Sequence, residues 1–437
     1  MAEDQPTSSE AAPLLGCIAD DVTGATDLAI NLVQGGMRVV QVLGIPTPTT
    51  LALTQSADAI VVALKTRSIP KQDAIDESLQ SLAALQAIGV ERFYFKYCST
   101  FDSTPEGNIG PVAEALMDTL GVSQTVFCPA FPRAGRTVYR GHLYVGDKLL
   151  HESGMQNHPL NPMTDADLVR VLSAQTSRPL GLLGYEAVSA GSETATAALQ
   201  TLDTNGVAHV ITDACSDEHL ATLAGSVASM PLVTGGSGLA RFLPEVYRSE
   251  GRLAATPSEP ELPNVSGRSL VIAGSCSTAT QAQVKRASES MAVWSVDVPA
   301  LMADAETELV RLLEWAKTQP ETQPILVAST TSPDKVSQLQ AEHGGAAVAA
   351  TIEAFLGRAV CEMTELLGVR RLVVAGGETS GAVAKALDVK ALRIGPEICP
   401  GVPWTLTLGQ EPAMAIAFKS GNFGDEHFFT TALEMLP

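Results

Sequence analysis

The sequence is poor in several features that mark particular classes of protein. Aromatic residues make up 5% of the 437 residues, and only 28 Lys and Arg stand against 48 Asp and Glu. The resulting net charge of −20 argues against nucleic acid or an acidic membrane surface as a partner. No apolar run reaches the length of a membrane-spanning helix. An acidic protein that binds anions must gather its few cations locally, so clusters of Lys and Arg become informative.

Cysteine patterns and a secretion signal are also missing. The seven cysteines include no Cys-x-x-Cys pair and no close Cys/His grouping, which argues against a disulfide framework or a zinc site and favours the reducing cytoplasm. Residues 1–13 are polar and acidic without an apolar core, so we expect a disordered tail and no signal peptide. The sequence contains no Gly-x-x-x-x-Gly-Lys-[Ser/Thr], which excludes a P-loop NTPase.

The residues that are present predict an α/β protein. Hydrophobic residues reach 45%, rich in Ala, Val and Leu, and short apolar runs alternate with segments of helical periodicity. This length predicts two or three domains. A segment with Pro257, Pro260 and Pro263 separates the two periodic regions and predicts a linker. We therefore expect an N-terminal domain at 14–250, a linker at 251–265 and a C-terminal domain at 266–437, each domain a mainly parallel sheet flanked by helices.

Two adjacent carboxylates, Asp20 and Asp21, follow the first predicted strand, Leu14 to Ala19. A helical pattern begins directly after them, so Asp20, Asp21 and Thr23 are expected at the carboxyl end of that strand, where open α/β sheets bind ligands. Neighbouring carboxylates are costly unless a metal, a hydroxyl or a helix N-terminus uses them. We expect one of them to act as a catalytic base. Capping of the helix is the alternative, and it accounts more easily for one aspartate than for both.

Cations and hydroxyls follow the next predicted strands of the first half. Because the carboxyl ends of parallel strands meet at one edge of a sheet, these groups are expected beside Asp20 and Asp21. Arginine can hold a carboxylate in a fork, and Ser, Thr and Asp can hold hydroxyls, which favours a small polyhydroxylated anion as ligand. Ordinary surface salt bridges are the alternative. The expected substrate-binding residues are Thr23, Lys65, Arg67, Lys96, Ser99, Thr100, Asp102, Arg133 and Arg136.

Glycine-rich loops follow predicted strands in the second half, at 274–278, 376–381 and 419–424. Glycine lets backbone N–H groups approach a phosphate, so three such loops favour a nucleotide, although glycine at a strand–helix turn also occurs for steric reasons alone. Glu378 could hold Mg²⁺ together with the phosphates. The glycines of Thr234 to Leu239, at the end of the first domain, fit a phosphate contact or a tight turn equally well.

These motifs resemble the four-carbon acid sugar kinases. The resemblance rests on Asp20 to Ala25, the Lys-Tyr-Cys-Ser-Thr-Phe-Asp-Ser-Thr run from Lys96, Pro129 to Pro132, Gly376 to Gly381 and Lys419 to Gly424, and it covers the chain after the tail. It implies an N-terminal substrate domain, a C-terminal nucleotide domain, and ATP and Mg²⁺ meeting the sugar acid in the interdomain cleft. It further implies transfer of phosphate to the terminal hydroxyl of a four-carbon acid. Gly376 to Gly381 and the run 157–163 are most similar to the branch that acts on 3-oxo-tetronate.

The resemblance also implies residue roles. ATP contacts are expected at Ser275, Gly376, Gly377, Glu378, Thr379, Ser420 and Gly421, with Glu378 at the metal. Asp20 or Asp21 would deprotonate the C4 hydroxyl, and the sequence leaves open which one. D-threonate, L-threonate and erythronate remain alternative substrates, and a non-catalytic sensor of ATP and a sugar acid is the alternative of another class. A homodimer is one of the assemblies left open.

Overall fold

The computed structural model describes residues 12–157, 161–254, 260, 265–329 and 344–436. The chain forms two compact units, Met1–Ser258 and Glu259–Pro437, and each is treated by itself below. The division falls inside the predicted linker 251–265. Residues 255–259 and 261–264 of that linker, and residues 1–11 of the predicted tail, lie outside the described residues.

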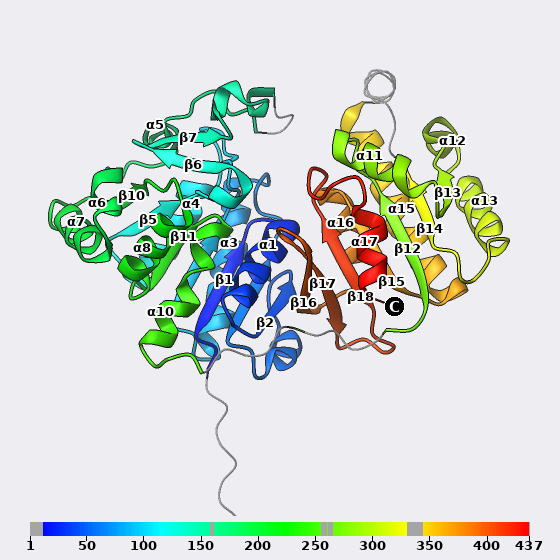
Figure 1. Cartoon of the computed structure of the whole chain (residues 1–437), viewed down its shortest axis with the longest axis horizontal. Coiled ribbons are helices and arrows are strands. Elements are labelled where there is room, and N and C mark those ends of the chain that lie inside the picture. Colours follow the sequence, from blue (N-terminus) through cyan, green and yellow to red (C-terminus); the bar gives the residue numbers. More distant parts are fainter. Residues whose placement is uncertain (1–11, 158–160, 255–259, 261–264, 330–343, 437) are drawn as a thin grey trace, which may run out of the picture. The chain divides into compact units, whose positions relative to one another are not determined.

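The first unit is built on a parallel sheet with the strand order β2-β3-β1-β4-β11-β5-β10-β9 (Figure 1). The central strands are buried on both faces, which explains their nearly continuous apolar runs. Their bounds are β1 (Leu15–Ala19), β2 (Val39–Leu43), β3 (Ala59–Ala63), β4 (Phe93–Lys96), β5 (Thr125–Cys128), β9 (Leu180–Leu183), β10 (His209–Thr212) and β11 (Leu232–Gly235).

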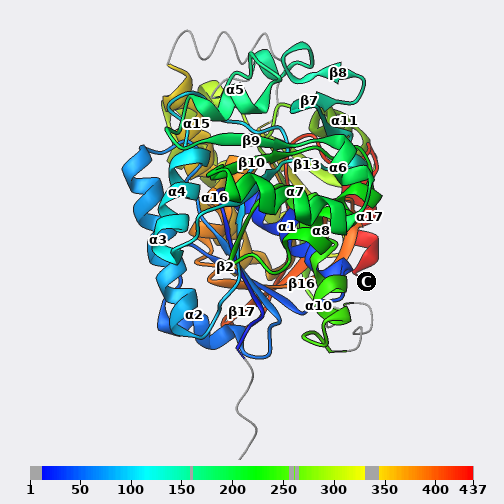
Figure 2. The same cartoon turned by 90° about the vertical axis from the view of Figure 1, so that its left-hand side faces the viewer.

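Helices cover both faces of this sheet. Figure 2 shows α3 and α4 on one side of the strands and α7, α8 and α10 on the other, and α1 packs with α9 on the latter side. The helices are α1 (Val22–Gln34), α2 (Pro48–Leu51), α3 (Lys71–Ala87), α4 (Ile109–Leu120), α5 (Leu168–Ser173), α6 (Tyr185–Ser189), α7 (Ser192–Thr204), α8 (Asp217–Val227), α9 (Ser237–Ala240) and α10 (Leu243–Ser249). Short 3₁₀ turns are η1 (Ala52–Thr54), η2 (Pro132–Ala134), η3 (Leu150–Glu152) and η4 (Met155–Asn157).

The second unit has its own sheet with the strand order β13-β14-β12-β15-β18-β17-β16. Each neighbouring pair among β13, β14, β12, β15 and β18 is parallel, whereas β17 pairs antiparallel with both β18 and β16. The strands are β12 (Arg268–Ala273), β13 (Ala292–Ser295), β14 (Ile325–Ala328), β15 (Val369–Ala375), β16 (Ala391–Cys399), β17 (Val402–Leu408) and β18 (Ala415–Lys419). The helices are α11 (Thr278–Ala287), α12 (Val298–Ala303), α13 (Ala305–Lys317), α15 (Gly345–Leu367), α16 (Gly377–Ala386) and α17 (Phe428–Met435).

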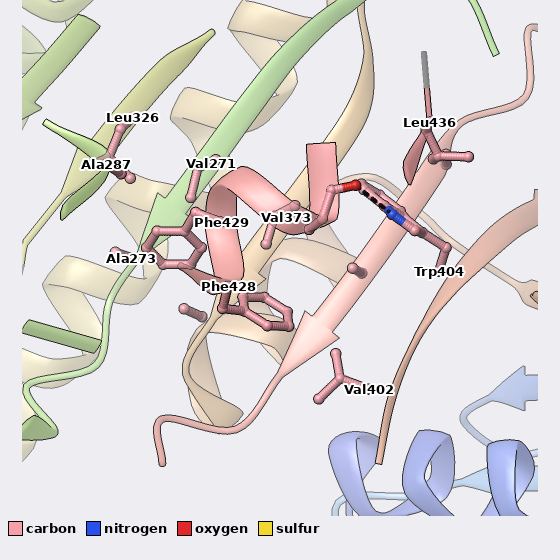
Figure 3. Packing of buried hydrophobic residues seen from close by; sticks show 14 of the residues in the cluster. Val271, Ala273, Ala287, Leu326, Val373, Val402, Trp404, Phe428, Phe429 and Leu436 are labelled. Atoms are coloured by element: carbon pink, nitrogen blue, oxygen red, sulfur yellow. Dashed lines mark hydrogen bonds between the residues drawn. The ribbon is translucent and has the colours of Figure 1, made fainter. Parts of the chain in front are cut away.

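Aromatic side chains fix α17 against the sheet of the second unit (Figure 3). Phe428 and Phe429 are buried at its start, and fully burying a side chain of this size stabilises the fold by about 1.5–3 kcal/mol. Trp404 of β17 is also buried, and its indole Nε1 donates a hydrogen bond of 2.8 Å to the carbonyl of Ala432. Helix α17 is therefore held by apolar contacts at its start and by a hydrogen bond further along.

The prediction of a mainly parallel α/β fold is confirmed. The antiparallel hairpin β16–β17 and the three-stranded sheet of β6 (Arg136–Tyr139), β7 (His142–Val145) and β8 (Lys148–Leu149) were not predicted. In the hairpin, Gly395 and Pro396 interrupt the apolar run of β16, and the register shifts there. No helix within the described ranges combines the length and the apolar character needed to cross a membrane.

Candidate functional site

The two adjacent aspartates lie where β1 ends and α1 begins. Asp20 follows the buried strand directly, and Asp21 is the N-cap of α1, where its Oδ1 accepts a hydrogen bond of 3.2 Å from the backbone N–H of Gly24. The Thr23 hydroxyl donates to the other oxygen of Asp21 at 2.7 Å. Helix capping therefore accounts for Asp21 alone, and Asp20 must have another reason to be there.

That reason is Arg67, which holds both carboxylates. Its Nε and Nη2 donate to the two oxygens of Asp20 at 2.9 and 2.7 Å, and Nη2 also donates to Asp21 Oδ1 at 2.6 Å. The loop that carries Arg67 is fixed by its backbone, because the N–H groups of Thr66 and Arg67 donate to the Asp20 carbonyl at 3.0 and 3.2 Å. Asn108 adds hydrogen bonds of 2.7 and 2.9 Å to the carbonyls of Thr66 and Ile69.

The surroundings shift the pKa values of the two aspartates in opposite directions. Burial raises the pKa of Asp20, and this effect exceeds the opposing attraction of Arg67. Burial also acts on Asp21, but the charges of Arg67 and Lys96 together with hydrogen bonds from Thr23 and Gly24 outweigh it and lower the pKa of Asp21. The Asp21 side chain is 25% exposed and that of Asp20 only 7%. Asp21 is thus the more acidic and the more accessible member of the pair.

Lys96, the last residue of β4, places a buried ammonium beside this pair. It is 3% exposed, and its Nζ donates to the Tyr97 carbonyl at 2.8 Å. A Cβ atom added to Gly24 would lie 2.2 Å from Asp21 Oδ1 and 3.3 Å from Lys96 Nζ. Only glycine at position 24 therefore allows the Asp21 carboxylate and the lysine to approach the first turn of α1 as they do.

The loop after β4 supplies further polar groups. The Thr100 hydroxyl donates to Asp102 Oδ1 at 2.6 Å and lies 2.9 Å from Cys98 Sγ, while Ser99 is half-buried. Burial raises the pKa of Cys98 to about 12, so the thiol is neutral at pH 7 and is no nucleophile. The hydroxyls of this loop are therefore ordered by contacts within it.

The remaining predicted cations, Lys65, Arg133 and Arg136, differ from Arg67 and Lys96 in their exposure or position. Lys65 and Arg133 are exposed, and Arg136 lies at the start of β6, outside the main sheet, where its Nη1 donates to the Ala134 carbonyl. Among the described residues, no hydrogen bond or ion pair joins Arg133 or Arg136 to Asp20 or Asp21. The structure gathers Asp20, Asp21, Thr23, Arg67 and Lys96 and leaves these two arginines apart from that cluster.

The glycines that end the first unit have a steric explanation. A Cβ atom on Gly235 would lie 2.5 Å from the Cys128 carbonyl oxygen, and one on Gly238 would lie 2.5 Å from that of Ala130. A Cβ atom on Gly236 would lie 2.8 Å from the Pro129 carbonyl oxygen. These contacts explain the glycines by close packing on the loop after β5, which was neither of the two sequence interpretations.

In the second unit, two predicted nucleotide loops pack on each other. A Cβ atom on Gly274 would lie 2.1 Å from Thr379 Oγ1, and one on Gly376 would lie 2.8 Å from the same oxygen. Gly376 has a φ of +131°, which L side chains rarely adopt. The N–H of Gly376 donates to the Lys419 carbonyl at 2.8 Å, so the third loop is joined to the other two.

A cavity of about 320 Å³ opens beside these loops. One wall consists of the glycine loops, and the other comes from the first turn of α12 and the start of α15. The lining residues include Ser275, Gly376, Gly377, Glu378, Thr379, Val298, Val348, Ile352 and Glu353. Ser329, also in the lining, is 3% exposed, and its Oγ has no hydrogen-bond partner among the residues that the structure describes. Sequence patterns did not reveal Val298, Ser329 or the α15 residues, because they approach the loops only through folding.

Glu378 lies in the first turn of α16 and lines the cavity. Over the described ranges no cluster of three or more His, Cys, Asp or Glu side chains could hold a metal ion by itself. Magnesium at a nucleotide usually binds one or two carboxylates together with phosphates and waters, so a cavity lined by glycine loops and by Glu378 and Glu353 fits that ion. Ser420 and Gly421, the other predicted contacts, are half-buried just beyond β18.

Comparison with known proteins agrees with the division of the chain into two units. Residues 15–243 match a family described as a sugar-binding N-terminal domain, and residues 270–429 match a nucleotide-binding C-terminal domain. Proteins named 3-oxo-tetronate kinase from Burkholderia multivorans and Pseudomonas fluorescens are both 50% identical over 431 residues, covering 98% of this chain and 99% of each relative.

Two solved structures are also similar to nearly the whole chain. A protein from Salmonella typhimurium is 40% identical, with a TM-score of 0.86, over 97% of this chain and 99% of that one. A protein from Haemophilus influenzae is 39% identical, with a TM-score of 0.78, over 97% of this chain and all of its own. The chain therefore belongs to the four-carbon acid sugar kinase family, in which a sugar-binding N-terminal domain precedes a nucleotide-binding C-terminal domain.

Proposed function

We propose that this chain is an ATP-dependent kinase that phosphorylates the C4 hydroxyl of 3-oxo-tetronate, giving the 4-phosphate and ADP. The observation that carries the proposal is identity of 41–50% to proteins named 3-oxo-tetronate kinase, over 96–98% of this chain. The Asp20–Asp21 cluster and the glycine-loop cavity supply the two kinds of group that such a reaction needs, one for a hydroxyl and one for phosphates.

In this mechanism Asp21 is the general base. Its carboxylate accepts the proton of the C4 hydroxyl while the oxygen attacks the γ-phosphorus and the bond to ADP breaks. The lowered pKa keeps the carboxylate ionised at neutral pH, and Thr23 and Gly24 fix its orientation. Asp20 has a different role, because both of its oxygens are bound by Arg67. It holds the guanidinium in place and thereby orients Asp21.

Arg67 and Lys96 supply positive charge for the substrate. Arg67 uses Nε and Nη2 on the aspartates, and Nη1 has no hydrogen-bond partner within the described ranges, so it is the group proposed for the substrate carboxylate. The Lys96 ammonium would stabilise charge that develops on the transferring group. Ser99, Thr100 and Asp102 would bind substrate hydroxyls, and Lys65, Arg133 and Arg136 would contribute only from the periphery.

ATP would occupy the cavity of the second unit, with its phosphates along Ser275, Gly376, Gly377, Thr379, Ser420 and Gly421. Glu378 would hold Mg²⁺, which when bound neutralises phosphate charge and leaves the γ-phosphorus open to attack. Transfer requires that the C4 hydroxyl and the γ-phosphate meet during turnover. The reaction belongs in the cytoplasm, where ATP is available and the seven free thiols stay reduced.

The test is coupled ADP release with ATP and Mg²⁺ over a panel of four-carbon acids: freshly generated 3-oxo-tetronate, D-threonate, L-threonate and erythronate. The highest kcat/KM is expected for 3-oxo-tetronate, and a higher value for another acid would reassign the substrate. ATP binding without ADP release on any acid would favour the sensor. Light scattering on the same preparation tests for a homodimer.

A further inference from the structure

Lys419, the last residue of β18, is a buried lysine surrounded by neutral oxygen atoms. The residue is 0% exposed, and in the part of the chain that the structure describes no Asp or Glu forms a salt bridge with it. Burial of an ammonium is costly unless its charge is used or paired. A methionine of similar length would fill the same space without that cost, so the charge itself requires an explanation.

The partners of the ammonium come mainly from one short loop. Nζ donates to the carbonyl oxygens of Ser420, Gly421 and Phe423 at 3.1, 3.0 and 3.1 Å, and to Thr280 Oγ1 at 3.3 Å. It also lies 5.7 Å from the ring centroid of Phe428, within the range of a cation–π contact. Carbonyl dipoles that converge on one point repel each other unless a cation lies between them, and potassium channels bind K⁺ with such carbonyls.

This loop is in turn attached to the loop at 275–277. The Gly421 carbonyl accepts hydrogen bonds from Ser277 Oγ at 2.7 Å and Thr280 Oγ1 at 2.9 Å, in addition to Lys419. A Cβ atom on Gly421 would lie 2.2 Å from Ser275 Oγ, so the two loops touch at that point. Any shift of the 420–423 segment would therefore reach Ser275, which lines the cavity.

We propose that the Lys419 ammonium is a built-in monovalent cation that shapes the 420–423 loop for nucleotide phosphates and adds an unneutralised positive charge behind it. This inference rests on the proposed function, because it takes the glycine loops to be the ATP site. Arg67 offers a contrast, since two carboxylates surround its charge, whereas the field of Lys419 is not cancelled by a salt bridge. Lys419 is a positioning residue, because its partners are protein oxygens.

The decisive experiment compares ATP affinity in Lys419→Met and Lys419→Ala with that of the wild type, by calorimetry in the presence of Mg²⁺. Both variants are expected to bind ATP at least about tenfold more weakly. In Lys419→Ala the vacated site should accept K⁺ or methylammonium, so that either cation restores affinity while tetramethylammonium, at equal ionic strength, does not. The wild type should show no such dependence. Lys285→Met, an exposed lysine on α11, is the matched control and should bind like the wild type.

Unchanged ATP affinity in a folded Lys419→Met variant would overturn the proposal. So would weakened affinity in Lys419→Ala that no small cation restores, because packing alone would then explain the loss. The inference and the kinase assignment fail separately: wild-type protein that binds ATP through Lys419 but releases no ADP contradicts only the kinase, whereas wild-type protein that binds no ATP contradicts both.

Should neither variant fold, the wild type gives a second test. Burial lowers the pKa of Lys419 to about 8, so ATP affinity should decline between pH 7 and 10. The ionisable group that acts on Lys419 is Cys399, whose pKa burial raises to about 12 and which has the carboxylates Glu397 and Asp425 near it. Arg286 of α11 contacts His427, which precedes α17. Affinity that stays constant to pH 10 would overturn the proposal.

Discussion

The general base is the part of the proposed mechanism that one substitution tests most directly. Asp21→Asn keeps the size and the helix-capping capacity of the side chain and removes its charge and its ability to accept a proton. Asparagine caps helices about as well as aspartate. Arg67 retains its two bonds to Asp20, so the scaffold of the site survives.

The expected magnitudes follow from these contacts. The variant weakens the charge-assisted bond of Arg67 Nη2 to Asp21 Oδ1, whose side chains are 23% and 25% exposed. It also reverses the bond with Thr23, whose hydroxyl must then accept from the amide. After a discount for that exposure, the free energy of unfolding should fall by about 1 kcal/mol. Loss of a general base typically reduces turnover about 10²- to 10⁴-fold. ATP binding should be almost unchanged, because Asp21 lies in the first unit and the glycine loops in the second.

The assay measures kcat by coupled ADP release, ATP affinity by calorimetry and stability by thermal unfolding on the same preparations. Asp58→Asn is the matched control. Arg38 binds Asp58 with the bidentate geometry that Arg67 has on Asp20, Nε to Oδ2 at 3.1 Å and Nη2 to Oδ1 at 2.7 Å, but at the amino end of β3. Its turnover should equal that of the wild type.

Two results would refute the reasoning. An Asp21→Asn variant with kcat within about tenfold of the wild type cannot have lost its base. A variant that loses ATP binding would place Asp21 in the nucleotide site. Asp20→Asn leaves the bonds from Thr23 and Gly24 to Asp21 in place and should retain more turnover than Asp21→Asn; the reverse order would make Asp20 the base.

Three further perturbations test other parts of the structure. Gly24→Ala would put a Cβ 2.2 Å from Asp21 Oδ1 and should lower kcat about 10²-fold by displacing the carboxylate, with ATP affinity unchanged. A normal kcat would contradict the catalytic importance of the position of the Asp21 carboxylate. Gly274→Ala would put a Cβ 2.1 Å from Thr379 Oγ1. Calorimetry should then show weaker ATP binding, and the free energy of unfolding should fall by about 1–3 kcal/mol, while the acid substrate still binds. Burial lowers the pKa of His209, so below pH 6.5 the unfolded chain gains a proton that the folded chain does not. Chemical unfolding should therefore show a free energy of unfolding that falls as the pH drops from 7.5 to 5.5, with a smaller slope in His209→Phe. Equal slopes in the two proteins would mean that another group causes the pH dependence.

The sequence by itself determined the two α/β regions and the position of the aspartate site. Buried parallel strands require apolar runs, and β1 was predicted within one residue of its bounds. The step from β1 to α1 places Asp20 and Asp21 at a strand end for the same local reason. The hairpin β16–β17 escaped prediction because its pairing depends on partners across the sheet and its pattern is broken at Gly395 and Pro396.

Only the tertiary structure decided what the individual site residues do. Arg67 stands 46 positions from Asp21, and only the register of β3 beside β1 brings its guanidinium onto both carboxylates and separates their pKa values. Packing likewise assigned the glycines of Thr234 to Leu239 to steric contact and surrounded Lys419 with carbonyls. Strand ends follow from local sequence, whereas charge, burial and contact depend on which distant segments pack together.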